Sequence, residues 1–390
     1  MASVMLKRGD NMYNKFVVPD YKNEDNFIDL MRTLYNCIGI KTGKYKKLAK
    51  YIPKNNHYLF ILCDGMGSNI VDQLKENSIL KKNKVKDLVT IFPSTTGCVL
   101  SSLATGSFPS DHGIWGWFNY NKEKKLNYYP VLFSRREDRV NLKSINIKRK
   151  DVFKNTSLLK SKSDYKINIL FSKSIVDSEY SKFVGYNKNR YAYETDLDII
   201  NFIKKDTLNN KKSFTYLYLS DIDKLEHANG IDSDLVFNRI SEIDNLVKEL
   251  SKIKDLTIVI TADHGQVNVS KKVVFNYSKY EKYFYAKPSI DCGTMSYYVK
   301  DEYFDKFNEE FSNDYHECVL FKTKDLEDKG YFNNKLSKYA KDSIGNFISV
   351  CKEDYYMISS DLIEKDEVLK GNHSGLLKGE MIIPLIVIGK

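Results

Sequence analysis

The chain of 390 residues has no long apolar run, and this absence narrows the classes of protein to which it can belong. A membrane-spanning helix needs roughly 18 or more uncharged apolar residues in a row, and no such stretch occurs. The opening residues, MASVMLKRGDNMYNKF, contain no apolar stretch of signal-peptide length. We therefore expect a cytoplasmic protein that does not bind membranes.

Paired cysteines are also absent. The six cysteines are scattered singly, at positions 37, 63, 98, 292, 318 and 351. Since no CxxC motif is present, the pattern suggests neither a disulfide framework nor a zinc finger. A reducing compartment fits this usage of cysteine.

Arginine is scarce, since only 8 of the 61 basic residues are arginine and 53 are lysine. A net charge of +10 is compatible with nucleic-acid binding. The lysines, however, are spread along the chain among many Asn and Tyr residues. We interpret them as a solvated surface and expect no specific nucleic-acid binding. The same positive field would attract a small phosphorylated substrate.

Short apolar runs are what the chain does contain, and they predict buried strands at 57–64, 86–92, 166–172, 214–221, 256–263 and 382–389. Runs without alternation are typical of strands that are covered on both faces. Residues 234–250 have the spacing of an amphipathic helix, with Asp232 or Ser233 available as its N-cap. The alternation of strand and helix predicts a doubly wound α/β fold.

The composition changes along the chain and indicates insertions. Residues 267–365 are rich in Tyr, Lys, Asp and Glu and contain only shorter apolar runs, so we expect an inserted cap subdomain there. The catalytic core is then expected to comprise residues 1–266 together with 366–390. Residues 121–163 are basic and polar, and we interpret them as a second, smaller insertion.

Acidic residues and histidines stand at or just after predicted strands, or shortly before the last one. The set is Asp64, Asp223, His227, Asp263, His264 and His373. Because the carboxyl ends of parallel strands meet at one edge of a sheet, these side chains should gather there. Each residue alone is typical of a turn or cap, but together they suit two divalent ions, with zinc favoured. We interpret His57 and His316 as structural, and for His112 we favour packing or hydrogen bonding over ligation.

The motifs in order are LCDGMG, FPSTTGCVLSSLATG, SDIDKLEHANG, TADHGQ and GNHSG. This ordered set resembles the alkaline phosphatase superfamily, and within it most closely the type I phosphodiesterase/nucleotide pyrophosphatase family. The resemblance extends from about residue 57 to 389. It implies an alkaline-phosphatase-like fold, with a central, mainly parallel sheet between helices and an inserted cap over the site.

The resemblance also implies roles for individual residues. Thr96, three residues after Pro93, matches the nucleophile, whereas Thr95 falls on a variable position and is expected to form a local hydrogen bond. Two zinc ions are implied, one held by Asp64, Thr96, Asp263 and His264, and the other by Asp223, His227 and His373.

Two departures from the family pattern affect the substrate site. Trp117 stands where eukaryotic relatives place an Asn that contacts a phosphate oxygen, so we expect the backbone N–H of Gly97 at a helix N-terminus to serve there. No Arg follows Thr96, although the phosphomonoesterases of the superfamily use one. Cys98 lacks the neighbours that a sulfatase would need.

These observations favour hydrolysis of a phosphodiester or nucleotide pyrophosphate through a phospho-threonine intermediate. The alternatives are a phosphomonoesterase, phosphonate hydrolase or phosphomutase on the same core, and a non-catalytic metal-binding protein. Trp115 and Trp117 either stack on a flat substrate group or pack the core beneath the site. For Arg135, Arg136 and Arg139 we favour a solvated face over phosphate binding.

Overall fold

The centre of the molecule is a seven-stranded sheet with the order β2-β18-β9-β1-β8-β6-β7. The computed structural model describes residues 16–43, 47–365 and 369–389. Strand β18 pairs antiparallel with both β9 and β2, and the remaining strands run in one direction. The strands are β1 (His57–Cys63), β2 (Lys84–Val89), β6 (Lys166–Ser172), β7 (Arg190–Tyr193), β8 (Ser213–Leu219), β9 (Leu256–Thr261) and β18 (Ile382–Ile388).

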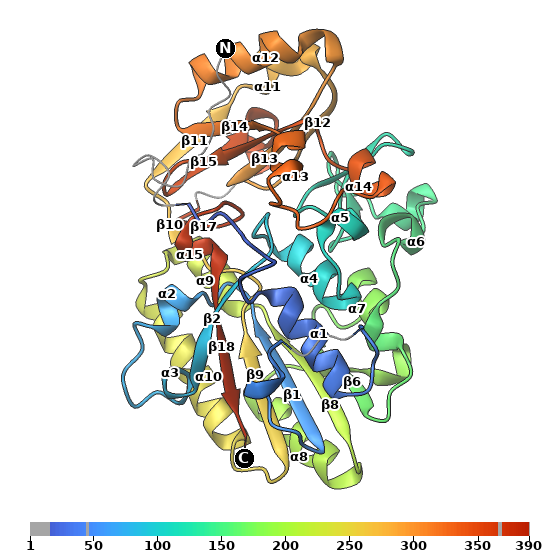
Figure 1. Cartoon of the computed structure of the whole chain (residues 1–390), viewed down its shortest axis with the longest axis vertical. Helices are drawn as coiled ribbons and strands as arrows, with labels where there is room; N and C mark the ends of the chain where they lie inside the picture. Colours follow the sequence, from blue (N-terminus) through green and yellow to red (C-terminus); the bar gives the residue numbers. More distant parts are fainter. Residues whose placement is uncertain (1–15, 44–46, 366–368, 390) are drawn as a thin grey trace.

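Helices cover the sheet, and in Figure 1 helix α1 lies in front of it while α8 and α10 lie behind it. Every residue of β1, β8 and β9 is buried, as their unbroken apolar runs predict. The helices around this sheet are α1 (Phe27–Cys37), α2 (Ser68–Val71), α3 (Ile79–Lys82), α4 (Thr96–Thr105), α5 (Pro109–His112), α6 (Arg149–Val152), α7 (Glu179–Val184), α8 (Asp196–Asn209), α9 (Asp221–Asn229), α10 (Asp234–Leu250) and α15 (Lys378–Met381).

Helix α10 confirms the amphipathic pattern predicted for 234–250. Its apolar stripe is buried, and Ser233 is the N-cap, with its side chain accepting a hydrogen bond from the Val236 N–H at 3.4 Å. The predicted strand at 86–92 is wrong at its carboxyl end, because the structure ends β2 at Val89. Beyond it the Thr90 N–H donates to the Met381 carbonyl and its hydroxyl to the Asp263 carbonyl, so the chain leaves the ladder.

Residues 267–365 form most of the upper part of Figure 1, at the carboxyl end of the parallel strands. They fold into a four-stranded antiparallel sheet, a parallel strand pair and four helices around it. The sheet strands are β12 (Phe284–Ile290), β13 (Thr294–Val299), β14 (Cys318–Lys322) and β15 (Phe347–Cys351), the pair is β11 (Lys271–Phe275) and β16 (Tyr355–Ser359), and the helices are α11 (Tyr277–Tyr280), α12 (Phe304–Asp314), α13 (Thr323–Asp328) and α14 (Lys338–Asp342).

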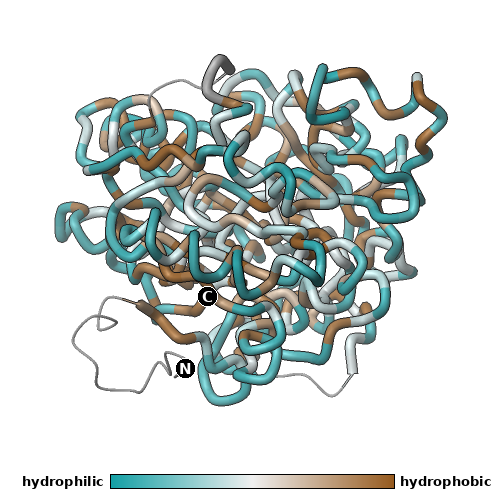
Figure 2. Tube along the Cα trace, turned by 90° about the horizontal axis from the view of Figure 1, so that it is seen from above, coloured by the Kyte–Doolittle hydropathy of each residue, from teal (hydrophilic) through white to brown (hydrophobic). Residues whose placement is uncertain are grey.

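This upper part has a hydrophobic cluster of its own, built around Phe275, Tyr297 and Phe307. Other side chains of the same segment, such as Ile290 and Phe332, belong instead to the cluster of the central sheet. The cap therefore packs firmly on the core, and the domain boundaries expected from composition stay a prediction. Seen from above, hydrophilic segments follow much of the periphery (Figure 2).

Two small sheets lie between the cap and the core. One pairs β10 (Val267–Asn268) with β17 (Gly371–Asn372), and the other joins β3 (Asn119–Asn121), β4 (Leu126–Tyr129) and β5 (Ser134–Arg135) within the predicted insertion at 121–163 and just before it. Among the described residues, no helix combines the length and the apolar composition that crossing a bilayer requires. The cytoplasmic location stays a prediction.

Candidate active site

Thr96 is the first residue of helix α4 and is placed beside the acidic cluster at the sheet edge. Its Oγ1 lies 3.1 Å from Nε2 of His264 and 3.4 Å from Oδ1 of Asp64. The preceding Thr95 is fully buried and turns the other way, donating its hydroxyl to Oδ2 of Asp291 at 2.6 Å. Only Thr96 therefore faces the residues expected to bind metal.

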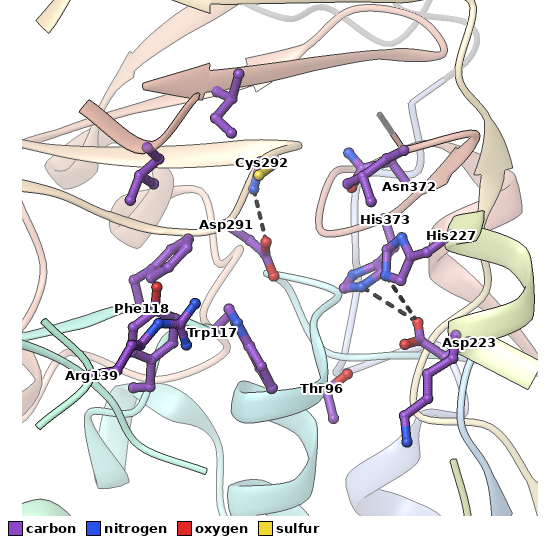
Figure 3. A pocket seen from close by; sticks show the side chains of 15 residues that line it. Thr96, Trp117, Phe118, Arg139, Asp223, His227, Asp291, Cys292, Asn372 and His373 are labelled. Carbon is purple, nitrogen blue, oxygen red and sulfur yellow. Dashed lines mark hydrogen bonds and ion pairs between the residues drawn. The ribbon is translucent and has the colours of Figure 1, made fainter. Parts of the chain in front are cut away.

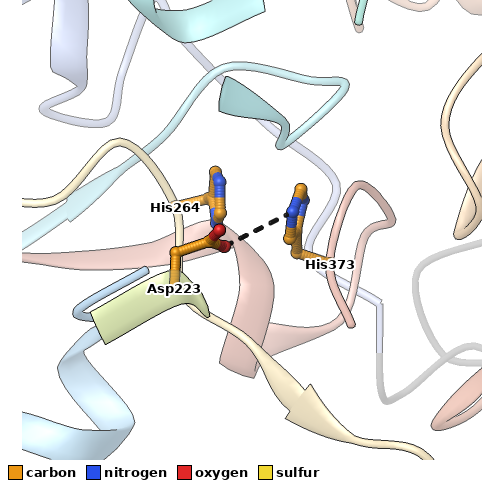
Figure 4. A group of neighbouring side chains, drawn as sticks. All are labelled: Asp223, His264 and His373. Atoms are coloured by element: carbon orange, nitrogen blue, oxygen red, sulfur yellow. Dashed lines mark ion pairs between the residues drawn. The ribbon is translucent and has the colours of Figure 1, made fainter. Parts of the chain in front are cut away.

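Six predicted ligands are gathered around Thr96 by the ends of the strands. Asp64 follows β1, and Asp263 and His264 follow β9. Two groups of three, among the described residues, have ligand atoms within 4.8 Å of one another, namely Asp64, Asp263 and His264, and Asp223, His264 and His373. Figure 4 shows the second group, in which His373 Nε2 lies 3.7 Å from Asp223 Oδ1.

His227 stands at the margin of the cluster, one helical turn after Asp223 on α9. Its Nε2 lies 3.3 Å from Asp223 Oδ1, and its ring centroid lies 5.1 Å from that of His373. The compact group of three contains His264 in place of His227. The six side chains thus share one sheet edge as expected, and their division between two ions stays a proposal.

The imidazole rings are oriented by backbone carbonyls. Nδ1 of His227 lies 2.8 Å from the Gly371 carbonyl oxygen, and Nδ1 of His373 lies 3.0 Å from that of Ser94. Because a carbonyl oxygen only accepts, both rings donate from Nδ1 and leave Nε2 free for the site. Such second contacts are typical of metal-binding histidines.

The carboxylates are held in the same way. The Tyr218 hydroxyl donates to Oδ2 of Asp64, and the Gln266 amide donates to Oδ1 of Asp223 at 2.6 Å. Neither partner was predicted from the sequence. Both come from positions that the tertiary fold alone brings to the site, Tyr218 from inside β8 and Gln266 from just beyond the DHG motif.

The electrostatics of the cluster fit a bound cation. Burial, followed by repulsion from Asp263 and Asp223, raises the pKa of Asp64 well above its usual range. Within the described part of the chain, Oδ2 of Asp263 is buried without a hydrogen-bond partner. Burial also holds the pKa of His373 well below its usual range, which favours the neutral imidazole that binds metal. A divalent ion would offset the crowded negative charge and give the orphaned oxygen a partner.

A cavity of about 330 Å³ opens beside this cluster. Figure 3 shows Thr96, Asp223 and His373 on one side of it, and Trp117, Phe118 and Arg139 on the other. Cap residues Asp291 and Cys292 also line the cavity, as does Asn372. The sequence reasoning missed Asp291 and Asn372; the GNHSG motif contained a signal for Asn372, whereas Asp291 gave none.

The two tryptophans have different environments. Trp117 lines the cavity with Thr96 and is available for contact with a substrate. Trp115 is fully buried, and its Nε1 lies within hydrogen-bond distance of the Ala340 carbonyl and of Oγ of Ser343. Stacking on the substrate and packing in the core were the two alternatives for Trp115, and its burial supports packing, so we no longer count it among the substrate-binding candidates.

The remaining predicted residues have local roles. His112 is buried between the Ser102 hydroxyl and the Ile114 N–H, which agrees with the hydrogen-bonding role favoured for it. His57 contacts the Ser213 hydroxyl at 2.9 Å. Gly97 lies in the first turn of α4, where backbone N–H groups lack helical acceptors. A Cβ at this glycine would lie 2.4 Å from the Gly116 carbonyl, so no larger residue fits, and its role as an anion donor stays a prediction.

Comparison with known proteins agrees with this arrangement. A family model, type I phosphodiesterase/nucleotide pyrophosphatase, matches residues 58–376. The chain is 24% identical over 303 residues to human ectonucleotide pyrophosphatase/phosphodiesterase family member 5, an alignment that covers 74% of this chain and 58% of that protein. The chain thus spans less than two thirds of this curated relative.

Solved structures share the fold. Murine ectonucleotide pyrophosphatase/phosphodiesterase 5 aligns with a TM-score of 0.64 at 18% identity, over 85% of this chain and 88% of that one. Phosphonoacetate hydrolase from Sinorhizobium meliloti 1021, in complex with phosphonoformate, aligns with a TM-score of 0.64 at 16% identity, over 87% of this chain and 91% of that one. An inactive variant of the murine protein, in complex with AMP, aligns with a TM-score of 0.63.

The sheet, its covering helices and the residues gathered at its edge place the chain in a class, the proteins with an alkaline-phosphatase-like α/β fold. Within that class, the chain belongs to the type I phosphodiesterase/nucleotide pyrophosphatase family, because the family model matches most of its length. The family expected from the ordered motifs is thereby confirmed.

Proposed function

We propose that this protein hydrolyses phosphodiester or nucleotide pyrophosphate bonds, with Thr96 as the nucleophile. The observation that carries the proposal is the position of the Thr96 hydroxyl, which borders the cavity at hydrogen-bond distance from His264 and Asp64. A threonine hydroxyl is a poor nucleophile unless its surroundings lower its pKa. Zinc ions bound by the six ligands would supply that activation and polarise the phosphoryl oxygens.

In the proposed reaction, Thr96 Oγ1 attacks phosphorus and gives up its proton while the oxygen of one ester or anhydride substituent leaves. Water then hydrolyses the phospho-threonine and restores the hydroxyl. Asp64 is placed to accept from the hydroxyl, and Tyr218 holds that carboxylate in position. The N–H of Gly97, at the positive end of α4, would face a phosphoryl oxygen. The complex of the murine relative with AMP supports a nucleotide as the substrate.

A second candidate, hydrolysis of a monoester or phosphonate, is favoured by one observation. The cavity is lined by Lys224, which neighbours Asp223 in the sequence. This cation could neutralise the extra charge of a monoester in place of the Arg that is missing beside Thr96. The likeness to phosphonoacetate hydrolase is compatible with this candidate and concerns the fold alone.

A substrate panel on zinc-loaded enzyme tests both candidates. The panel contains bis-p-nitrophenyl phosphate, p-nitrophenyl phosphate and a nucleotide pyrophosphate, and the measured quantity is kcat/KM. We expect the diester to exceed the monoester by about two decades, which corresponds to about 2.7 kcal/mol in transition-state free energy. A faster monoester would establish the second candidate instead.

Variants at the two threonines test the nucleophile. Thr96→Ala should lose activity by about three orders of magnitude or more, as the loss of other nucleophiles does. Thr95→Ala is the matched control, because it removes a neighbouring hydroxyl that faces away from the ligands, and it should keep most of the activity. Equal losses in both variants, or full activity in Thr96→Ala, would show that Thr96 is not the nucleophile.

A further inference from the structure

The three arginines of the small insertion differ in their partners. Arg135 forms an ion pair with Asp138. Arg136 is buried and pairs with Asp361 at 3.4 Å, so it ties the insertion to the cap. Arg139 is exposed, as expected, and it also lines the cavity that Thr96 borders; the ion pairs among the described residues do not include it. The structure thus corrects the expectation of a solvated face for Arg136, and it leaves Arg139 as a cation that a ligand in the cavity can reach.

Arg139 lies against an aromatic wall formed by Tyr129, Phe118 and Trp117. Its guanidinium carbon lies 3.8 Å from the centre of the Tyr129 ring, a distance typical of a cation–π contact. Tyr129 in turn packs edge-on against Phe118 and Trp117, with ring centroids 4.9 and 6.1 Å apart. A guanidinium that stacks on a ring keeps its N–H edge available, and this edge matches carboxylate or phosphate oxygens.

The wall and the nucleophile are at two ends of one cavity. In Figure 3, Trp117 stands between Arg139 on one side and Thr96 on the other. A substrate whose phosphorus lies at Thr96 can therefore extend along the Trp117 face and end at Arg139. Such a substrate has a reacting phosphoryl group at one end, an apolar or aromatic spacer in the middle, and a negative charge at the end that meets Arg139.

We infer that Arg139 and Tyr129 form a subsite for a second anionic group, a phosphate or a carboxylate, carried by the substrate beyond the reacting phosphorus. This inference rests on the proposed function, since it takes the phosphoryl group to be at Thr96. It extends that function by restricting the substrate class. A diester without a second anionic group would use only half of the cavity, whereas an ester that carries a phosphate or carboxylate beyond an apolar or aromatic spacer would use both ends.

Binding of rigid ligands tests the subsite without catalysis. Isothermal titration of the zinc-loaded protein would compare phenylphosphonate with its para-carboxyl, para-phosphono and neutral para-carbamoyl derivatives. We expect the two anionic derivatives to bind about 10- to 100-fold more tightly than phenylphosphonate, as charge-assisted hydrogen bonds do. The carbamoyl derivative should bind like the parent, and the anion with the larger gain identifies the preferred group.

Variants test whether Arg139 causes the higher affinity of the anionic derivatives. Arg139→Met should erase the gain and leave the affinity for phenylphosphonate unchanged, and Arg139→Lys should retain part of it because the charge remains. Lys122→Met is the matched control, because it removes one positive charge beside the same small sheet from a side chain that is 61% exposed and does not line the cavity.

Two results would overturn the subsite and leave the proposed function intact. One is a gain that survives in Arg139→Met, and the other is a carbamoyl derivative that binds as tightly as the carboxyl derivative, because stacking would then explain the affinity. If the wild-type protein binds none of the phosphonates, both the subsite and the placement of the phosphoryl group at Thr96 are wrong.

Discussion

The hydrogen bond between Thr95 and Asp291 connects helix α4 to the cap, and it predicts a measurable energetic coupling between the two residues. Thr95 is the N-cap residue of α4, and Asp291 lies in the turn between β12 and β13. The two oxygens are 2.6 Å apart, and the Cys292 N–H donates to the other carboxylate oxygen at 2.9 Å. Burial raises the pKa of Asp291, so the hydroxyl is one of the few groups that stabilise its charge.

The expected change in the free energy of unfolding follows from the burial of this pair. A hydrogen bond to a charged group contributes about 1.5–3 kcal/mol, and a buried acceptor that loses its donor costs a similar amount. Thr95→Val keeps the shape of the side chain and removes the donor, so the free energy of unfolding should fall by about 1–3 kcal/mol. Asp291→Ala should reduce it as well, and the double variant should show a coupling of about 1–2 kcal/mol.

Urea denaturation of the four proteins measures this coupling. Tryptophan fluorescence is a suitable signal, since Trp115 and Trp117 are the only tryptophans of the chain and both belong to this region. Thr105→Val is the control at the other end of α4, because its hydroxyl donates within the helix to Ser101. It should show no coupling with Asp291. A Thr95–Asp291 coupling below about 0.5 kcal/mol would refute the reasoning, since independent sites reach that value.

Two further predictions concern pH and metal. Burial raises the pKa of Glu380 from 4.5 to about 7, so the stability gained by its protonation is complete below about pH 4.5 and is lost as the pH rises through 7. The unfolding free energy of Glu380→Gln relative to wild type should therefore increase across this window, by at most about 3 kcal/mol, and a constant difference would contradict this. Removal of metal by a chelator should lower the melting temperature, because Asp64 and Asp263 then repel each other. Zinc at about 100 times its Kd should restore about 2.7 kcal/mol of unfolding free energy. Metal analysis that finds no zinc, together with a melting temperature that zinc does not change, would exclude the metal site.

The sheet and the gathering of the ligands could be predicted because both depend on local signals. Strands β1, β8 and β9 are unbroken apolar runs, and such runs are stable only when both faces are covered. Asp64 directly follows β1 and Asp263 lies just beyond the end of β9, and these two strands are neighbours in the sheet. Once parallel pairing is assumed, their proximity follows from topology alone.

Other features depend on contacts between distant segments and gave no local signal. The indole of Trp115 is fixed by Ala340 and Ser343, more than 200 positions away, so its burial could not be read from the HGIWGW segment. Arg139 and Arg136 are three positions apart, yet one lines the cavity and the other is buried against the cap. Whether such a side chain is buried or faces the cavity thus depends on its tertiary partners and not on its residue type.

The features that follow from local signals and those that depend on distant contacts are expected to have different roles in the site. The groups proposed to react come from the edge of the central sheet, where topology places them with little freedom. The groups proposed to select a substrate, Arg139, Trp117 and Asp291, come from segments that flank the small sheet and from the cap. Changes in these segments should alter the ratio of kcat/KM between substrates more than the rate on the smallest ester. We therefore expect the core to carry out the reaction, and the segments around the small sheet and in the cap to select the substrate.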